Sequence, residues 1–538
     1  MRSKGRNCGL KRSLISDGEI LTLVQDLTGI VPVGNLGRET PLDFTSLDRL
    51  RASLLHRELF SKYDDFKQSP EKEATTWKRF QEAEDLCRKT NWSFPRLLRK
   101  DPFWWSVRER IRRALGRLNW QAVARGMDHG PGGTTRLPRR FGAQAYKYSG
   151  QPETTSGNVA LSVAAIVGTP LWFQSVASCD EGSKLRVIEV DGNHVLKVPK
   201  NYKTDRTIAK EPCMNVFVQK GLGNVIRHRL RSVGVFLNDQ TVNQRSAQLG
   251  SINGQLATID LSMASDTVSA MVIRRLFPSD WVEAFEQCRS PVGRLPSGET
   301  RVYQKFSSMG NGYTFEVESL LFWAICQTCV TWNCDEVDTS IRVYGDDLVV
   351  PSTICGPLLT RLQQAGFKPN VDKTWVEGPY RESCGKHYYL GEDVSPFYVR
   401  RPVRKLTDLF LLHNNLRRWL WARGDLGDCE ALKKLRKLAP PAWREPRLPD
   451  GFGDGAFIGA IDQLRLDSHP RGWEGWQVSV LAVSQRQLAD DLPPGQLVAS
   501  LRSLARSRAD RFGFRESTSV RPVRDGKVSR STVFIPKT

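Results

Sequence analysis

Two short apolar runs near the middle of the chain flank a polar tetrad and predict a β-hairpin. The runs are Ile341–Val343 and Leu348–Val350, and the tetrad between them reads Tyr-Gly-Asp-Asp at 344–347. Branched apolar residues favour strands, and a polar turn that contains glycine is typical of a hairpin. The turn therefore places two adjacent carboxylates at a hairpin tip.

A second apolar strand, at 255–260, also ends in an aspartate. Gln-Leu-Ala-Thr-Ile leads into Asp260, and another acidic residue, Asp266, follows six positions later. Because glycine and aspartate are common turn formers, the hairpin aspartates alone would be weak evidence for a site. Two strands that each deliver a carboxylate to one point predict a divalent-metal site, which is the chemistry of phosphoryl and nucleotidyl transfer.

Three aspartates can be given roles on this basis. We expect Asp260 and Asp346 to hold two Mg²⁺ ions, for which Mn²⁺ is a possible substitute, and Asp347 to support them from the rim. One ion would lower the pKa of an RNA 3′-hydroxyl, and the other would neutralise the charge that builds on a leaving pyrophosphate. The alternative is three ordinary surface turn residues.

Patterns elsewhere predict a mixture of strands and helices. Amphipathic stretches up to about residue 125 predict helices, residues from 184 to 198 predict strands, and an apolar run at 319–332 predicts a further helix. A Gly- and Pro-rich segment at 126–133 marks a loop, and since no P-loop pattern occurs, a P-loop nucleotide site is unsupported. The chain after about 403 is helical and basic in pattern. The fold class predicted is α/β (α+β).

Composition adds a polyanionic partner to this picture. The 538 residues include 79 Lys and Arg against 58 Asp and Glu, which gives a formal charge of +21 and a pI near 9.6. Nine of these cations fall between Lys197 and Arg231, where the only acidic residues are Asp205 and Glu211. Basic clusters spread through a folded chain favour a lined RNA channel, although each cluster alone is equally compatible with a solvated helix face.

The cysteines and the uncharged stretches point to a reduced, soluble protein. The eleven cysteines show no regular framework, and Cys326-x2-Cys329-x4-Cys334 falls in an apolar stretch without a neighbouring fourth ligand, so zinc is disfavoured there. The uncharged segment Thr154–Cys179 is interrupted by polar residues, Gly and Pro, so we expect a buried soluble element rather than a membrane span. No secretory signal is visible at the N-terminus.

The ordered motifs resemble the palm motifs of viral RNA-dependent RNA polymerases, and most closely those of replicase catalytic (β) subunits of levivirus-type single-stranded RNA bacteriophages. The residues that carry the resemblance are Asp260–Asp266, Ser308–Phe315, Tyr344–Asp347, Val198–Asn201, Lys210–Pro212 and Gln219–Gly221. It implies a right-hand polymerase with fingers, an antiparallel palm sheet with helices, and a helical thumb. The implied domains are an N-terminal region with fingers (1–250, with a basic segment for NTP and RNA at 184–231), a palm (251–402), and a thumb with the C-terminal region (403–538).

The resemblance also implies a nucleotide site. A basic finger segment grips the incoming triphosphate in such polymerases, and Lys200, Lys203 and Arg206 fit that position. Lys197 and Lys210 are expected to join them, with plain contact to the RNA backbone as the alternative.

Recognition of the ribose is implied for a second group of residues. Asp266 resembles the acidic residue that monitors the ribose 2′-hydroxyl, with Ser308 and Asn311 as companions. Many viral polymerases have an asparagine four residues after the motif threonine, whereas this chain has Glu318 after Thr314. That departure leaves the hydrogen-bond network around the sugar open.

Further basic residues downstream complete the predicted site. Lys373 occupies the place of a lysine near the leaving pyrophosphate and would act as a general acid, the alternative being a surface lysine after a turn. Lys386, Arg400 and Arg401 are expected to face RNA.

The predicted function is template-directed RNA synthesis that replicates a single-stranded RNA phage genome, by attack of an RNA 3′-hydroxyl on an NTP with release of pyrophosphate. A reverse transcriptase is the first alternative, and a non-catalytic RNA-binding protein, suggested by charge alone, is the second. The expected partners are template and product RNA and NTPs, without a membrane. By resemblance they include the host elongation factors Tu and Ts and a ribosomal protein, in the cytoplasm of a bacterial host.

Overall fold

The predicted hairpin forms and lies in a four-stranded antiparallel sheet. The strands are β5 (Leu256–Ser262), β8 (Arg342–Tyr344), β9 (Asp347–Pro351) and β10 (Lys368–Pro369), in the order β10-β5-β9-β8. Neighbouring strands are antiparallel throughout. The two strands that were expected to carry aspartates are therefore hydrogen-bonded neighbours at the centre of the sheet.

This computed structural model describes residues 13–63, 69–177, 185–333, 341–464, 466–468, 474–484, 495–510 and 527–536. The chain divides into two compact units. The central unit comprises residues 68–392 and 490–517, and the terminal unit comprises residues 1–67, 393–489 and 518–538. The three-way division at 250 and 402 stays a prediction, since compactness groups the first 67 residues with those after 392.

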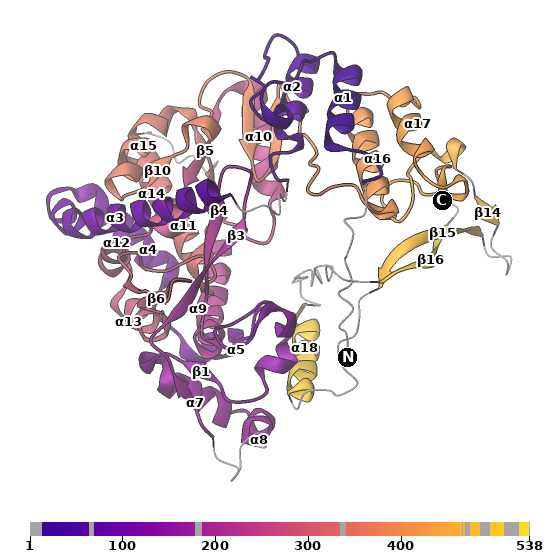
Figure 1. The fold of residues 1–538 in the computed structure, drawn as a ribbon. Helices are drawn as coiled ribbons and strands as arrows, with labels where there is room; N and C mark the ends of the chain where they lie inside the picture. Colours follow the sequence, from indigo (N-terminus) through magenta and orange to yellow (C-terminus); the bar gives the residue numbers. More distant parts are fainter. Residues whose placement is uncertain are drawn as a thin grey trace. The chain divides into compact units, whose positions relative to one another are not determined.

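Helices cover the four-stranded sheet β10-β5-β9-β8, here called the palm sheet, because their apolar faces need burial. The helix α14 (Thr314–Asn333), which begins five residues before the predicted apolar run, contacts β8 and is buried along most of its length. It also packs on α15 (Cys355–Gln364), where the Phe322 and Phe367 rings meet edge to face at 4.7 Å. On the same sheet, α10 (Thr241–Asn253) contacts β5 and β9. Figure 1 shows α14 and α15 beside β5 and β10.

The basic segment contributes two strands to a second sheet in the central unit. Its strands are β3 (Asn193–Pro199), β4 (Asp205–Lys210), β6 (Val292–Arg294) and β7 (Thr300–Val302), in the order β4-β3-β6-β7. The strands β3 and β4 form an antiparallel hairpin, here called the basic hairpin, in which Lys197 lies opposite Thr207. The helix α9 (Cys213–Ser232) follows the hairpin and belongs to the main hydrophobic core.

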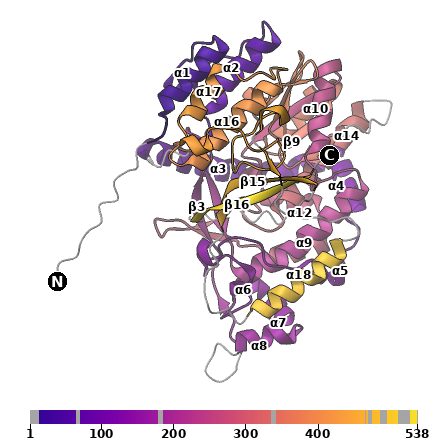
Figure 2. The same cartoon turned by 90° about the vertical axis from the view of Figure 1, so that its right-hand side faces the viewer.

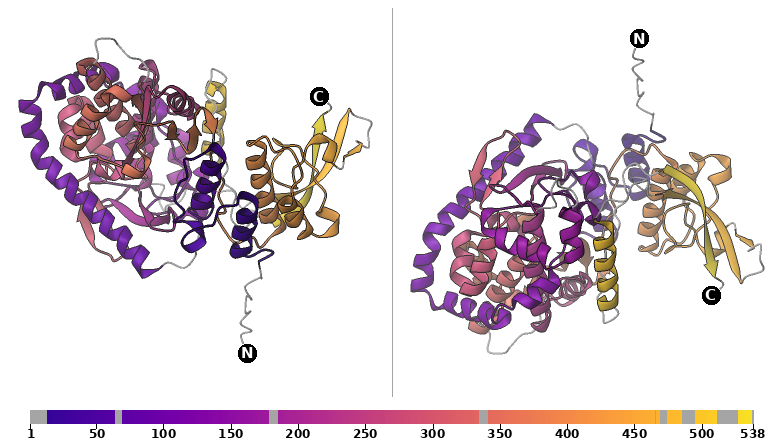
Figure 3. Two further views of the ribbon diagram at one scale, coloured as in Figure 1. Left: turned by 90° about the horizontal axis from the view of Figure 1, so that it is seen from above. Right: turned by 90° about the horizontal axis from the view of Figure 1, so that it is seen from below.

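One long helix, α3 (Pro70–Lys100), packs against β4 of the second sheet and against the helices that follow β5. Ser69 caps its N-terminus and Pro70 follows, which is a favourable start for a helix. Near this end, Lys72 forms an ion pair with Asp205 of the basic hairpin at 2.9 Å. Further along, Asn91 donates to the Gln304 carbonyl at 2.8 Å and accepts from the Met271 backbone N–H at 2.8 Å. Figure 3 shows this helix along the outside of the central unit.

Shorter elements complete the central unit. Its other helices are α4 (Pro102–Leu115), α5 (Trp120–Gly126), α6 (Gln144–Lys147), α7 (Val159–Val167), α8 (Pro170–Ala177), α11 (Ala264–Thr267), α12 (Ala270–Leu276), α13 (Ser279–Cys288) and α18 (Gln496–Asp510). Its other strands are β1 (Glu153–Thr154), β2 (Ile188–Glu189), β11 (Tyr380–Ser383) and β12 (Lys386–Tyr389). Although α18 comes late in the sequence, it packs against α6 (Figure 2).

The described part of the uncharged segment, residues 154–177, contains the bent pair α7 and α8. Its residues Ile166 and Trp172 are buried, whereas Val163 and Val167 are exposed, so the expected buried element is only half covered. Across the described ranges, no single helix is long and apolar enough to cross a membrane, and this pair passes that test only jointly, with a bend of 108°.

The terminal unit has its own core of helices and a small sheet. Its elements are α1 (Asp17–Thr28), α2 (Leu47–Leu59), α16 (Leu406–Trp421), α17 (Glu430–Lys437), β14 (Asp467–Ser468), β15 (Gly475–Ser484) and β16 (Lys527–Pro536). The helical pattern predicted after 403 is confirmed by α16 and α17, but the sheet β14-β15-β16 was not predicted. Buried residues of α1, α2, α16 and α17 share one hydrophobic cluster.

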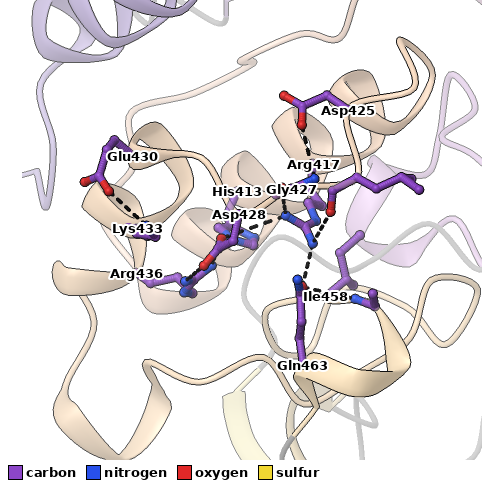
Figure 4. Close-up of polar contacts among 12 residues, drawn as sticks. His413, Arg417, Asp425, Gly427, Asp428, Glu430, Lys433, Arg436, Ile458 and Gln463 are labelled. Atoms are coloured by element: carbon purple, nitrogen blue, oxygen red, sulfur yellow. Dashed lines mark hydrogen bonds and ion pairs between the residues drawn. The ribbon is translucent and has the colours of Figure 1, made fainter.

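A buried arginine network joins α16 to the loops that follow it (Figure 4). Arg417 is 1% exposed and donates to the Gly427 carbonyl and to Gln463 Oε1, both at 2.6 Å. Burial lowers the pKa of Arg417, and Asp428 opposes that effect. Satisfying a buried guanidinium with several acceptors is what makes its burial tolerable.

We predict that Asp205→Asn destabilises the central unit by about 3 kcal/mol, because it leaves the half-buried Lys72 ammonium without its partner. The measurement is urea-induced unfolding of the full chain. The matched control is Glu109→Gln, which breaks exposed pairs with Arg112 and Arg113 on α4 and should barely move the unfolding midpoint. Equal effects of the two substitutions would contradict the role given to the Lys72–Asp205 pair.

Candidate active site

The strand register brings two of the predicted aspartates face to face. Asp260 on β5 lies directly opposite Asp347 on β9, and Asp347 in turn lies opposite Tyr344 across the hairpin. Asp346 occupies the second position of the two-residue turn between Tyr344 and Asp347. The three carboxylates therefore gather at one end of the palm sheet, as the sequence predicted.

The first turns of α14 fix the position of the hairpin tip. Gly345 has φ of 61°, and a Cβ there would come within 2.5 Å of the Phe315 ring, so the turn requires glycine. The Gly345 N–H donates to Ser319 Oγ at 3.1 Å, and the Phe315 and Tyr344 rings meet edge to face at 5.1 Å. The aspartates are thus carried on a rigid support.

The gathered carboxylates strain one another electrostatically. Burial, followed by the charges of Asp346 and Asp260, raises the pKa of Asp347 to about 7. Burial also raises the pKa of Asp260, although Asn370 Nδ2 donates to its Oδ2 at 2.7 Å and the Lys373 charge opposes the rise. Sequence reasoning missed Asn370, which lies directly before the short 3₁₀ helix Val371–Lys373 and gave no separate signal.

This crowding is the observation that suits a divalent cation. Among the described residues, no group of three or more His, Cys, Asp or Glu side chains is arranged as a complete metal site. Oxygen ligands of this kind are nevertheless the ones that Mg²⁺ prefers, often only one or two carboxylates together with water and phosphate oxygens. The carboxylates of Asp260, Asp346 and Asp347 provide such ligands and a negative charge that the protein itself does not fully offset.

Lys200, at the end of the basic hairpin, is the predicted cation most directly coupled to these carboxylates. Burial of its charged end and repulsion from Arg206 lower the pKa of Lys200, although the residue as a whole is exposed, and Asp260 and Asp346 oppose that shift. Lys203 and Arg206 are both exposed. The hairpin therefore presents positive charge toward the acidic end of the palm.

The two remaining cations of this group lie differently. Lys197 forms an ion pair with Glu73 of α3 at 2.7 Å, and its side chain is only 15% exposed. Lys210 lies opposite His194 on β3, and its side chain reaches the Gly133 backbone. The sequence did not indicate that Lys197 would be paired with a residue of α3.

The predicted sugar-sensing aspartate has a partner that the sequence analysis missed. Asp266 is buried in α11, and its Oδ1 accepts a hydrogen bond from the Lys305 Nζ at 2.7 Å. Thr207 of the basic hairpin donates to the other oxygen, Oδ2, over a longer 3.4 Å. The only available signal was a single lysine just before the glycine loop at 307–312, 39 positions from its partner.

The glycine loop is held against the basic hairpin and α9. The Ala209 N–H donates to the Met309 carbonyl at 2.8 Å, and Gly310, with φ of 111°, lies so close that a Cβ would be 2.2 Å from the Ala209 carbonyl oxygen. The Gly312 N–H donates to Gln219 Oε1 at 3.0 Å. Ser308, which is buried, and Asn311 are placed beside the hairpin by this packing.

The sequence matches a known protein family over most of its length. Residues 15–472 match the family described as RNA replicase, beta-chain. The chain belongs to this family. It is 37% identical over 492 residues to the RNA-directed RNA polymerase subunit beta of Qbeta virus (strain MX1), covering 88% of this chain and 81% of that protein. It is 40% identical over 438 residues to the subunit of the same name from Enterobacteria phage SP, covering 77% and 72%.

A solved viral polymerase gives only a weak structural likeness. The RNA-dependent RNA polymerase of a human picobirnavirus, in an insertion-loop deletion mutant, aligns with 66% of this chain and 83% of that chain at 11% identity and a TM-score of 0.32. A score this low supports no argument. The resemblance inferred from the motifs is confirmed by the family match and the sequence relatives, and the mixed α/β class by the fold itself.

In this replicase family member, Glu318 stands close to the acidic end of the palm. It is buried, and burial followed by the Asp346 charge raises its pKa well above the ordinary value. Ser265 Oγ donates to Glu318 Oε2 at 2.7 Å. A glutamate therefore occupies the position where many viral polymerases have asparagine. Its carboxyl group is hydrogen-bonded to Ser265, the residue before Asp266, and not to Asp266 itself.

The downstream basic residues of the replicase chain are only partly gathered at the site. Lys373 is half exposed and pairs with Glu382 at 2.7 Å, while its charge acts on Asp260. Lys386 lies opposite Ser383 in the β11–β12 hairpin. In the terminal unit, Arg401 pairs with Asp408 at the start of α16 at 2.7 Å, and Arg400 is exposed. Contact of these residues with RNA stays a prediction.

The cysteines at 326 and 329 are core residues of α14. Both are buried, and burial raises the pKa of each thiol. Cys334 lies outside the described residues. Within the described part of the chain these thiols belong to no metal-binding group, and the expectation that zinc is disfavoured here stays a prediction.

We predict that Asp347→Asn stabilises the metal-free replicase chain at pH 8 by on the order of 2 kcal/mol. The folded state keeps Asp347 protonated up to about pH 7, whereas the unfolded chain ionises it near its ordinary pKa, so wild-type stability falls as the pH rises from about 4 through 7. The gain should therefore be largest above pH 7 and vanish near pH 4. Unfolding in EDTA at both pH values measures it.

The control for this pH dependence is Asp191→Asn, the same substitution at an exposed position before β3. It should leave stability unchanged at both pH values. A gain for Asp347→Asn that did not depend on pH would contradict the account of crowded carboxylates.

Proposed function

We propose that this protein is an RNA-directed RNA polymerase that replicates a single-stranded RNA phage genome. The observation that carries the proposal is the pairing of Asp260 with Asp347, beside Asp346 in a glycine turn, on the central strands of an antiparallel sheet. Membership of the replicase β-chain family supports it, since relatives in this family are named RNA-directed RNA polymerase.

The proposed cofactor is Mg²⁺, as two ions, with Mn²⁺ as a possible substitute. Asp260, Asp346 and Asp347 would hold these ions, which when bound would activate the RNA 3′-hydroxyl and neutralise the departing pyrophosphate. Asn370 orients the Asp260 carboxylate by its hydrogen bond to Oδ2. The support of the hairpin by Phe315 and Ser319 keeps Asp346 and Asp347 in register with Asp260.

The basic hairpin would position the triphosphate. Lys200 is within electrostatic reach of Asp260 and Asp346, so a phosphate chain bound to Lys200 would lie next to the acidic end of the palm. Exposed Lys203 and Arg206 extend the same positive surface. Holding the two reactants together in this way supplies a large part of the acceleration in phosphoryl transfer.

Lys373 is proposed as the proton donor to pyrophosphate. Its charge already acts on Asp260, and its side chain is half exposed beside Glu382, so its ammonium group is accessible to a phosphate oxygen. A protonated lysine at this point would deliver a proton as the negative charge of the leaving group develops.

No observation on the described residues favours a reverse transcriptase or a non-catalytic RNA-binding protein. The partners that we propose are template RNA, product RNA and NTPs. The printed name of the relatives, subunit beta, indicates that those polymerases have other subunits. For this chain, elongation factors Tu and Ts and a ribosomal protein, in the cytoplasm of the bacterial host, stay proposals that rest on resemblance.

We predict that Asp346→Asn lowers RNA synthesis at least about 1,000-fold, because it removes a metal-binding charge at the point where the transition state needs it. Binding of template RNA should be retained, since basic residues supply it. Primer extension with NTPs measures the first quantity and a filter-binding titration the second.

The control for loss of synthesis is again Asp191→Asn, which should extend primers at the wild-type rate. Synthesis by Asp346→Asn at the wild-type rate would overturn the proposed function. Loss of RNA binding in parallel with synthesis would instead indicate a folding defect.

We also predict that Mg²⁺ raises the Tm of the wild-type chain at pH 8, because it offsets the crowding of Asp260 and Asp347. The increase should be much smaller in Asp346→Asn. Differential scanning calorimetry in EDTA and in millimolar Mg²⁺ makes the comparison. An equal increase in both proteins would show that the ion binds elsewhere.

A further inference from the structure

One buried lysine, just before the glycine loop at 307–312, plays no part in the proposed mechanism. Lys305 is 2% exposed and follows β7 at the entrance to the glycine loop. Its Nζ lies 2.7 Å from Asp266 Oδ1 and 3.7 Å from Glu84 Oε1 of α3. The Phe80 and Tyr303 rings are within 4.6 and 5.0 Å of the same nitrogen.

The charges around Lys305 keep it ionised. Burial alone would lower the pKa of Lys305, but Asp266, Tyr303 and Glu84 together raise it above the ordinary value. The pKa of the Glu84 carboxyl group is also raised, in this case mainly by burial, which disfavours its charged form. The Glu84 carboxyl also accepts a hydrogen bond from the Gln304 N–H at 2.6 Å, so it has a partner of its own. The short contact to Asp266 is therefore the principal ion pair.

This ion pair leaves the two oxygens of Asp266 unequal. Oδ1 is occupied by Lys305, whereas Oδ2 receives only the 3.4 Å bond from Thr207. Thr207 belongs to the basic hairpin, on the buried face of β4, so Oδ2 of Asp266 faces that hairpin. The oxygen with spare acceptor capacity is thus the one beside the basic hairpin, which is proposed to bind the nucleotide.

A carboxylate turned by a buried partner recognises a hydroxyl better than one that rotates. A site built to hydrogen-bond a substrate hydroxyl rejects an analogue that lacks it, because its own polar group is then left unpaired. Without Lys305, Asp266 would be a buried, uncompensated carboxylate next to Glu84. It would then rotate or take up a proton, and either change removes a fixed acceptor from this position.

We propose that Lys305 is a positioning residue that sets ribose selectivity by holding Asp266 with one oxygen turned toward the sugar of the incoming nucleotide. The proposal rests on the proposed polymerase function. It assigns to a buried lysine, acting through Asp266, the second-partner role that many viral polymerases give to an asparagine and that Glu318 does not fill here.

The test is single-nucleotide extension by the full chain, with any proteins that copurify with it, on an RNA template-primer whose next template base is uracil. ATP and dATP are compared for the wild type and Lys305→Met, with kcat and KM determined separately. We expect kcat/KM for ATP to fall about 30-fold or more and that for dATP to change less than about threefold, so that the ratio falls about tenfold or more. Lys305→Arg, which retains the charge, should restore most of the ratio.

Two further variants separate positioning from folding. Glu84→Gln keeps the Lys305–Asp266 pair and should leave the ATP/dATP ratio unchanged. Asp266→Asn should lower the ratio, and adding Lys305→Met to it should lower the ratio no further, because the two residues act through one contact. The double variant leaves neither Lys305 nor Asp266 as an unpaired charge, and Glu84 keeps its hydrogen bond from the Gln304 N–H. It therefore decides the question even where Lys305→Met alone does not fold.

Several outcomes would overturn the inference. These are an equal loss with ATP and dATP in Lys305→Met, and a further drop in the ratio when the two substitutions are combined. If the wild type extends primers with ATP but Lys305→Met leaves the ATP/dATP ratio unchanged, only the role of Lys305 is rejected. Absence of synthesis from the wild type would reject the proposed function itself.

Discussion

The structure depends on one unfavourable arrangement, the placement of three carboxylates at the end of a buried sheet. Asp260 and Asp347 are opposed across neighbouring strands, with Asp346 in the adjoining turn, so the Asp346 charge raises the cost of ionising both, and Asp260 adds to that cost for Asp347. The rest of the central unit compensates for this cost. Apolar helices such as α14 provide the packing free energy, and Asn370, Lys200 and Lys373 provide partial electrostatic relief. Stability is given up where the chemistry requires charge, as is common at active sites.

The same logic of compensation organises the polar interior around the palm. Buried charges are tolerated when they are paired, and the pairs here connect elements that are distant in sequence. Lys72 and Glu73 of α3 neutralise Asp205 and Lys197 of the basic hairpin, and Glu84 of the same helix meets Lys305. Positive charge that is left outside such pairs, as at Lys203 and Arg206, lies on the exposed side of the hairpin. The division between paired and exposed cations distinguishes structural lysines from those available to a polyanion.

Sequence reasoning succeeded where the determinants are local. The hairpin at 341–350 and the strand that ends near Asp260 were predictable because apolar patterning and a glycine turn specify them within ten residues. Their pairing was expected from chemistry, since two strands that each end in a carboxylate can together bind a divalent cation. The partners of Lys197 and Asp266 were not predictable, because Glu73 and Lys305 come from elements 124 and 39 positions away and no periodicity marks them. The sheet of β15 and β16 escaped prediction for the same reason, since its strands are separated by more than 40 residues.

The long helix α3 has a consequence for how this chain can change over time. Its residues from Lys72 to Asn91 touch the basic hairpin at one end and the loops around the palm at the other. A helix of 31 residues is about 46 Å long, and its interior proline, Pro95, lies beyond Asn91, so the backbone between Lys72 and Asn91 sets the spacing of those two contact regions. Insertions or deletions within it would rotate every later contact by 100° per residue and uncouple the two regions at once. We therefore expect a change in the length of this helix to be far more damaging than substitutions on its exposed face.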